Sequence, residues 1–316
     1  MRVRFVSSLA RALGVMLPVL SFAPAALAAT FTVTNTNDSG AGSLRQALLD
    51  ANSTVGADTI SFAIPGAGVK TILPTSALPA VTERVTIDGW SQGGVGYLGS
   101  PLVEIDGANL LNVNGLEIGA SDCVIRGLCI NNFNVNPSSP SNGAGIKVRN
   151  GALRNTIFSC YIGVDPTGMT AKGNGQFGIW IDAGAENNRI GTDGNGARDT
   201  AERCIIGGTK RFHGVWILGN NNIVAGNYIG VGADGVTPVP NFFDGVMIQN
   251  SASGNRIGTD GSGANDANER NVISGNGQRG VAVVNAGAGN KIAGNYIGTT
   301  ATGLAPLANQ AAGINI

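Results

Sequence analysis

The segment NRIGTDG at residues 188–194 returns unchanged at residues 255–261, 67 residues further along the chain. A Tyr-Ile-Gly triplet keeps nearly the same spacing, with its tyrosines at Tyr161, Tyr228 and Tyr296. Self-similarity at a fixed period indicates a repeat protein, in which each structural unit packs only on its neighbours. The chain is therefore expected to be a stack of similar units.

A shorter period of 30–36 residues lies inside this unit and defines single rungs. In each rung, apolar residues two positions apart flank one outward residue, the period of a strand with one buried face. We therefore predict an all-β fold, a right-handed parallel β-helix in which three short strands per rung are joined by turns. The marker segments, of the form Gly-apolar-x-apolar, begin at Gly115, Gly145, Gly178, Gly214, Gly245, Gly280 and Gly313.

A recurring asparagine marks one turn of each rung. Its side-chain amide can bond to the turns above and below, as in stacked cross-β structures, which predicts a structural ladder. The five members of this ladder are Asn155, Asn188, Asn222, Asn255 and Asn290.

The sequence divides the chain into three predicted parts. Residues 1–28 are typical of a secretory signal peptide, because arginines precede an apolar run and Ala-Leu-Ala closes the segment. Residues 29–80 predict an N-terminal cap of a strand and a short helix that protects the first strand edge. Residues 81–316 hold the β-helix repeats and stop in mid-rung, which suggests a truncated or continuing tower. We expect a secreted protein of the periplasm, cell surface or extracellular space.

Charge and hydropathy exclude two classes of partner. Removing the three arginines of the signal leaves 17 basic and 20 acidic residues, a balance that argues against nucleic acid. No later stretch has the roughly 18 apolar residues that a transmembrane helix needs. The oligomeric state is left open.

Residues 32–47, TVTNTNDSGAGSLRQA, resemble the N-terminal motif of bacterial proteins named for a Cys-Ser-Leu-Arg-Glu-Ala signature. This chain has Gly42 in place of the cysteine and Gln46 in place of the glutamate. Its Asn-Tyr-Ile-Gly-Thr and Asn-Val-Ile-Ser-Gly-Asn units are similar to the repeats of that family and of the wider pectate-lyase-like superfamily. The resemblance implies the fold and secretion, whereas the fold hosts lyases, hydrolases, epimerases and adhesins.

The outward residues of the Gly-marked strands form one predicted surface column. Adjacent strands lie about 4.8 Å apart, so Trp180 and Trp216 become neighbours in an aromatic ledge that invites a ligand. By resemblance to enzymes and lectins of the superfamily, the ledge is a polysaccharide-binding candidate together with Lys147 and Glu117. The alternative is that a loop folds over both tryptophans. The whole column is Glu117, Lys147, Trp180, Trp216, Met247, Ala282 and Asn315.

Catalysis on this face would need paired carboxylates, or a base beside a bound cation. The available groups are Asp182 and Asp244 as acids and Lys147, Arg149 or His213 as base. No motif of the known β-helix enzymes accompanies them.

Two repeated loops gather acids that could surround Ca²⁺. An Asp before Gly is also an ordinary turn, and a Glu beside an Arg is commonly a local ion pair. No other cofactor is expected. The acids are Asp193, Asp199 and Glu202 in one loop and Asp260, Asp266 and Glu269 in the next.

The four cysteines divide into a candidate pair and two packing residues. Cys160 and Cys204 occupy equivalent turn positions on adjacent rungs, within disulfide reach, although parallel Cβ vectors make the torsion awkward. Cys123 and Cys129 are expected to pack in the interior.

Taken together, these patterns favour a secreted binding or structural module that contacts polysaccharide or another extracellular polymer through the ledge. The rival hypothesis is a polysaccharide lyase, glycoside hydrolase or epimerase that uses the same strand face. A third is a passive spacer on which no patch binds.

Overall fold

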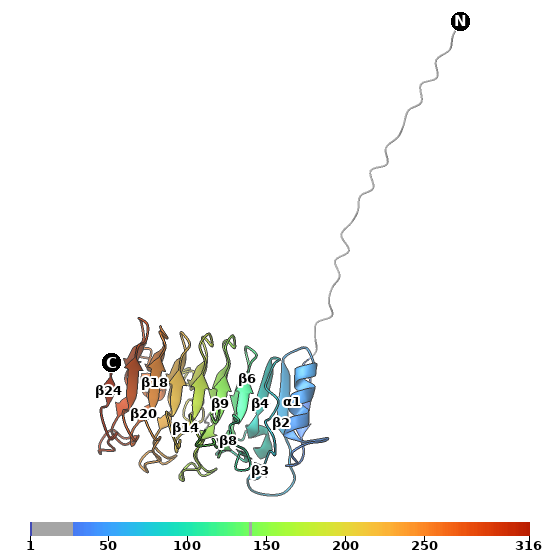
Figure 1. Ribbon diagram of the computed structural model, residues 1–316, viewed down its shortest axis with the longest axis horizontal. Helices are drawn as coiled ribbons and strands as arrows, with labels where there is room; N and C mark the ends of the chain where they lie inside the picture. Colours follow the sequence, from blue (N-terminus) through green and yellow to red (C-terminus); the bar gives the residue numbers. More distant parts are fainter. Residues whose placement is uncertain (2–27, 139–140) are drawn as a thin grey trace.

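The chain folds into a parallel β-helix, as the repeats predict. The computed structural model describes residue 1, residues 28–138 and residues 141–316, so the predicted signal peptide lies outside the described residues apart from its two ends. Within that part of the chain, the strands form three all-parallel sheets that run side by side along the tower. In Figure 1 the rungs follow one another from the helix at the N-terminal end to β24 at the other end.

The first sheet contains β1 (Thr30–Val33), β2 (Asp58–Phe62), β4 (Val85–Asp88), β7 (Val124–Arg126), β10 (Thr156–Phe158), β13 (Arg189–Gly191), β16 (Ile223–Ala225), β19 (Arg256–Gly258) and β22 (Lys291–Ala293). The second contains β3 (Lys70–Ile72), β5 (Val103–Asp106), β8 (Leu128–Asn131), β11 (Tyr161–Ile162), β14 (Ile205–Ile206), β17 (Tyr228–Ile229), β20 (Val272–Ile273) and β23 (Tyr296–Ile297). The third contains β6 (Leu116–Ile118), β9 (Ile146–Val148), β12 (Ile179–Ile181), β15 (Val215–Ile217), β18 (Val246–Gln249), β21 (Val281–Val284) and β24 (Ile314–Asn315).

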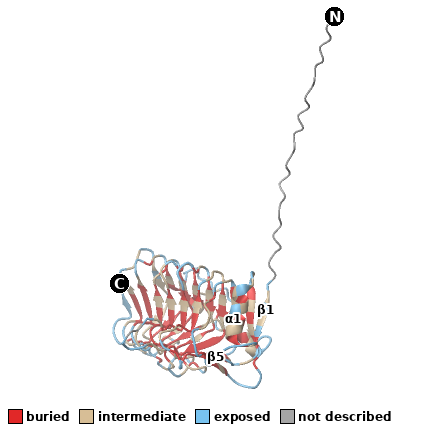
Figure 2. Ribbon diagram, turned by 45° about the vertical axis from the view of Figure 1, so that its right-hand side comes forward, coloured by how far each residue is buried: buried red, intermediate tan, exposed pale blue. Residues whose placement is uncertain are grey.

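The core is a column of aliphatic layers enclosed by the sheets. In β12, Ile179 and Ile181 are fully buried while Trp180 between them points outward. The strands pair in register, so Ile179 lies over Val215 of the next rung. In Figure 2 the buried residues, drawn red, recur in the strands of rung after rung along the tower. Period-two patterning thus fixes which residues reach the outer face.

Helix α1 (Leu44–Ser53) covers the N-terminal end of this column. Ser43 caps it by accepting a hydrogen bond from the backbone N–H of Gln46, and its apolar side buries Leu44, Leu48 and two alanines. The predicted cap region, residues 29–80, is in fact mixed. Strands β1, β2 and β3 within it already pair in the sheets, so only α1 and its flanking turns lie outside the rungs. Elsewhere in the described residues, η1 (Gly89–Gly93) and α2 (Asp266–Glu269) are short helical turns between strands.

The segment before α1 is tied to the tower by Asp38 and Arg45. The Arg45 guanidinium pairs with Asp38 at 2.8 Å and also donates to the carbonyls of Ser76 and Ala77. Gly42 stands between them with φ +74°, and a Cβ there would overlap Thr34 Oγ1. A glycine therefore fits this backbone where the signature that it resembles has a cysteine.

The Asp38 contact predicts a pH-dependent contribution to stability. Hydrogen bonds from Arg45, and then from Thr75, lower the pKa of Asp38 from 3.8 to about 2. Because the folded-state pKa is depressed, the stabilisation is complete above about pH 4 and is lost as pH falls toward 2. We expect Asp38→Asn to cost about 1–2 kcal/mol near neutral pH, after allowance for partial exposure, and to cost almost nothing near pH 2. Chemical unfolding at several pH values measures this, with Glu83→Gln as a control carboxylate away from the contact; a cost independent of pH would contradict it.

None of the helices in the described part of the chain is long and apolar enough to cross a bilayer.

Candidate functional site

The predicted outward column is present on the third sheet. Strand pairing places Lys147, Trp180 and Trp216 side by side, with Met247 next along the tower. The two indole rings lie 5.2 Å apart, and Lys147 Nζ sits 3.6 Å from the centroid of the Trp180 ring. Both tryptophans are half-buried, whereas Met247 is buried. The column is thus an aromatic pair with a cation stacked on one end.

Phenylalanines that precede the Gly-marked strands extend this pair. Phe177 is nearly parallel to Trp216 at 4.5 Å and stacks on Phe212 at 5.4 Å, and Phe243 follows Phe212 at 6.1 Å. The sequence analysis did not select them, although each lies one or two residues before a marker glycine. A side chain from the preceding segment, Phe177, therefore covers part of the tryptophans without enclosing them. We call Phe177, Trp180, Phe212, Trp216 and Phe243 the aromatic surface.

Two cavities open along the aromatic surface and share residues. One of about 410 Å³ is lined by aromatic rings together with Gln176, His213 and Gln249. The other, of about 440 Å³, is lined by Leu218, Asn250 and Asn285. Trp216 and Gln249 line both, so the two cavities adjoin on the third sheet, and we call them together the groove. An aromatic floor with a few amide groups is the usual lining of a ligand site.

Hydrogen-bonding groups in this groove are only partly used. Trp216 Nε1 donates to Gln249 Oε1 at 3.3 Å, while the Gln249 amide nitrogen makes no hydrogen bond within the described residues. Among the described residues, Trp180 Nε1 is enclosed and has no hydrogen-bond partner.

Four of the predicted charged residues are engaged in ion pairs beside the aromatic surface. Lys147 Nζ lies 3.5 Å from Asp182 Oδ2, and Arg149 Nε lies 3.7 Å from Glu117 Oε2. Asp182 and Lys147, proposed as acid and base, are thus each other's partners. Glu117 also accepts a hydrogen bond from Asn114, which fixes it away from the tryptophans.

His213 and Asp244 come together at the edge of the aromatic surface. His213 Nδ1 lies 3.2 Å from Asp244 Oδ2, without the alignment of a hydrogen bond. Asp244 is 1 % exposed, accepts from the backbone N–H of Arg279, and has the Arg279 guanidinium 3.9 Å away. Phe177, Phe212 and Phe243 surround the imidazole at about 6 Å. A buried carboxylate behind a histidine is an arrangement that orients an imidazole for proton transfer.

The five predicted ladder asparagines hydrogen-bond from rung to rung. Asn155, Asn188, Asn222 and Asn255 each donate from the backbone N–H to the side-chain oxygen of the next asparagine at 2.8–3.0 Å. Further ladders occupy other turns. One runs through Asn227, Asn271 and Asn295, and another through Asn241, Asn276 and Asn309.

Cys160 and Cys204 stack at the turn that asparagines occupy in later rungs, but they are free thiols, not the predicted disulfide. Stacking in register keeps the two side chains parallel, which is unfavourable for the disulfide torsion. Burial raises the pKa of Cys204 well above 9, and the neighbouring Cys160 thiol adds to the effect. Cys123 and Cys129 are also free and fully buried, as expected for packing residues.

Burial predicts that all four thiols are unreactive in the folded protein, because the thiolate is the reactive form and cannot be solvated there. We expect an aromatic disulfide reagent to modify none of them before denaturation and four per chain afterwards. Protein purified from the periplasm of an expression host and denatured under non-reducing conditions gives the test. Two reactive thiols there would show that Cys160 and Cys204 pair on export.

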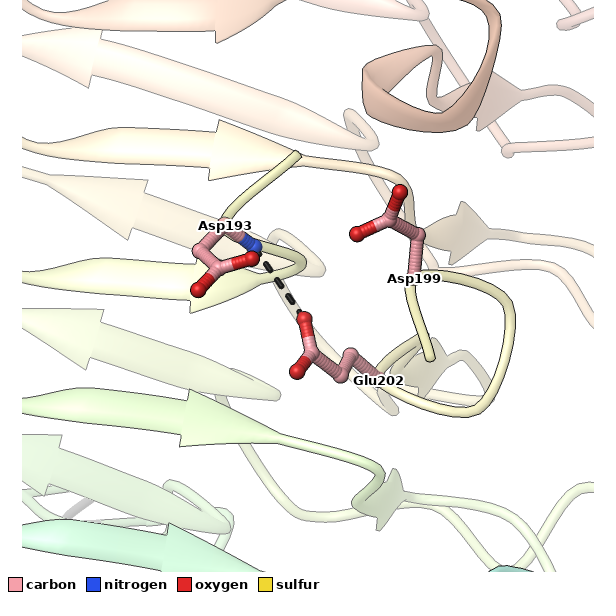
Figure 3. A group of neighbouring side chains, drawn as sticks. All are labelled: Asp193, Asp199 and Glu202. Atoms are coloured by element: carbon pink, nitrogen blue, oxygen red, sulfur yellow. Dashed lines mark hydrogen bonds between the residues drawn. The ribbon is translucent and has the colours of Figure 1, made fainter. Parts of the chain in front are cut away.

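The predicted acids gather in both loops. In each loop, three carboxylates bring one oxygen apiece within 4.8 Å of one another. Figure 3 shows Asp193, Asp199 and Glu202 facing one another, with the Asp193 N–H donating to Glu202. Burial, and then the nearby charges of Asp193 and Asp199, raise the pKa of Glu202, although hydrogen bonds oppose this.

Internal donors already bind most of these carboxylates. Asp199 accepts from Thr192, the Gly196 N–H and Asn268. In the second loop, Arg256 lies 2.9 Å from Glu269, whose other oxygen accepts from the Asp260 N–H; Asp266 completes the group. These contacts account for the gathered carboxylates without a bound ion. Calcium binding at the two loops stays a prediction.

Comparison with known proteins places the chain in no family. No family model matches it, and no curated protein matches it. Among solved structures, the crystal structure of an alginate lyase from Paenibacillus sp. str. FPU-7 is similar over 91 % of this chain and 99 % of that chain, with 15 % identity and a TM-score of 0.22. The fold assignment rests on the three parallel sheets themselves, and the resemblance of residues 32–47 to the signature family stays a prediction.

Proposed function

We propose that this protein is an exported module that binds polysaccharide along the aromatic surface of the third sheet. The observation that carries the proposal is the groove in which Trp216 and Gln249 line both cavities. Ring faces can pack against the C–H faces of sugar rings, while amides can both donate to and accept from hydroxyl groups. Cellular export is proposed from residues 1–28 alone.

The groove favours an extended chain over a compact small molecule. Its two cavities together run from Phe212 on one side of the tryptophans to Asn285 on the other. Its lining carries amides from several rungs, and the Lys147 ammonium that stacks on Trp180 is paired with Asp182. Such a lining matches a neutral or weakly acidic polymer that presents repeated hydroxyl groups.

Catalysis is a second candidate function, which the contact between His213 and Asp244 favours. Of the two imidazole nitrogens, Nδ1 faces the buried carboxylate and is the one that is enclosed without a partner. In this arrangement Nε2 would serve as the base toward a sugar in the adjoining cavity, which His213 lines.

One experiment separates the two functions. The mature protein is incubated with neutral and uronate-containing polysaccharides, with and without Ca²⁺, and retention and product release are recorded together. Retention without products supports the binding module. Products that disappear in Asp244→Asn would replace it with the enzyme. Neither retention nor products with any polymer would overturn both.

A further inference from the structure

A second cavity system lies on the first sheet and is independent of the aromatic surface. Its main cavity, of about 400 Å³, lies between the segment 88–98 and Arg126, with Arg198 reaching in from the loop that carries the first acidic group. Trp90 and Tyr97 supply aromatic walls. This site takes no part in the function proposed above.

The charged side chains that line this cavity, Asp88, Arg126 and Arg198, carry a net charge of +1. Arg126 is held by two hydrogen bonds to Asp88, at 2.9 and 2.8 Å, and packs over the Trp90 ring at 5.4 Å. Those bonds use Nε and Nη2, so Nη1 has no partner among the described residues. The Arg198 side chain makes no hydrogen bond or ion pair within the described residues, so its charge is unmatched. A monoanion would balance the site.

Arg198 also occupies an unusual backbone position. It has φ +67°, a left-handed conformation that arginine rarely adopts, at a position where the next repeat unit has Asn265 with φ +60°. Asn265 uses its side chain to bond the Gly194 carbonyl, a structural role, whereas the Arg198 side chain lines the cavity. The Arg198 carbonyl accepts from the N–H groups of Ala201 and Glu202 and so holds the loop turn, while its side chain is left to line the cavity.

Trp90 forms the inner aromatic wall of the cavity. It is 6 % exposed and packs edge-on against Phe158 at 5.5 Å. Its Nε1–H is a buried donor without a partner in the described residues, which costs free energy unless an acceptor reaches it. The half-buried Tyr97 ring suits the C–H face of a sugar ring, and two arginines suit a planar carboxylate.

We propose that this cavity binds a carboxylate-bearing sugar, with the carboxylate between Arg126 and Arg198 and the sugar ring against Tyr97, beside Trp90. The neighbouring cavity, which Arg126 also lines, holds Asp193 and Glu202 beside Arg189, so it offers a second acidic unit no net positive charge. The site thus takes one acidic unit, a free monosaccharide or the end of a chain.

Tryptophan fluorescence tests the proposal directly. The chain has three tryptophans, so the variant Trp180→Phe/Trp216→Phe reports from Trp90 alone. We expect glucuronate to change its emission in a saturable manner, while glucose at the same concentration leaves it unchanged. Asparagine occupies the equivalent position 265 of the next unit and tolerates the left-handed backbone. Adding Arg198→Asn should therefore weaken glucuronate binding about tenfold without disturbing the loop.

Three results would overturn the site. The first is an equal response to glucose. The second is an affinity for acetate as high as for glucuronate, which would mean that the site binds an anion and does not recognise a sugar. The third is an unchanged glucuronate affinity in the folded Arg198→Asn variant. A uronide oligosaccharide that ends in glucuronate distinguishes a free monosaccharide from the end of a chain. If only the free sugar binds, the site is restricted to monosaccharides. Because the reporter variant lacks both tryptophans of the third sheet, failure here leaves the polysaccharide proposal untouched.

Discussion

Replacing Asn222 by alanine is expected to lower the free energy of unfolding by about 3–4 kcal/mol. The Asn222 side-chain oxygen accepts from the backbone and the amide of Asn188, while its own amide donates to Ala185 and Asn255. The residue is fully buried, so water cannot replace these bonds. The truncation leaves several buried polar groups unpaired.

Urea unfolding followed by circular dichroism measures the loss, and Asn37→Ala is the matched control. Asn37 is exposed in the turn before the helix, and its replacement should change stability by less than about 0.5 kcal/mol. Because repeat towers can unfold in parts, both transitions are compared at two wavelengths. A cost below about 1 kcal/mol for Asn222→Ala would mean that the ladder only accompanies the stacked strands and does not stabilise them.

Replacing Trp216 by alanine should weaken polysaccharide binding by about 30-fold, which corresponds to about 2 kcal/mol. Its ring lines both cavities, stacks on Phe177 and lies beside Trp180. Removing it interrupts the groove at its centre and releases Gln249 from its hydrogen bond. Calorimetry with the best-retained polysaccharide of the panel gives the affinity.

Two variants make the result specific. Leu304→Ala removes an apolar side chain that is 90 % exposed on another loop and should bind as the wild type does. Trp216→Phe keeps a ring at the position and should lose less affinity than alanine. If alanine and wild type bind equally while the variant remains folded, the aromatic surface is not the binding site.

The repeat pattern was sufficient to predict most of the tower. Apolar pairs around Trp180 and Trp216 predicted both the inward layers and the outward neighbours, because a strand has only two faces. The first rungs were not predicted, since β2 and β3 lack the Gly-marked pattern and are joined by turns of other lengths. Their place in the sheets depends on long-range pairing that no local segment encodes.

The candidate sites were predicted less completely, for reasons of side-chain packing. Phe177 and Phe212 stand outside the strand triplets, so the period gave no direction for their rings, although their place before the marker glycines was a usable signal. The cavity on the first sheet was missed altogether. Trp90 and Arg198 are 108 residues apart in the sequence and meet only because two loops project from the same sheet.

The stacked asparagine turns also bear on how such a chain can change its length during evolution. One 67-residue unit begins and ends at equivalent positions of every ladder, so an added copy would find the same partners above and below. Duplication or loss of a whole unit would therefore move the loops and grooves apart in steps of two rungs while the interior stayed the same. The reach of the protein along a polymer would then be set by gene duplication and not by repacking of its core.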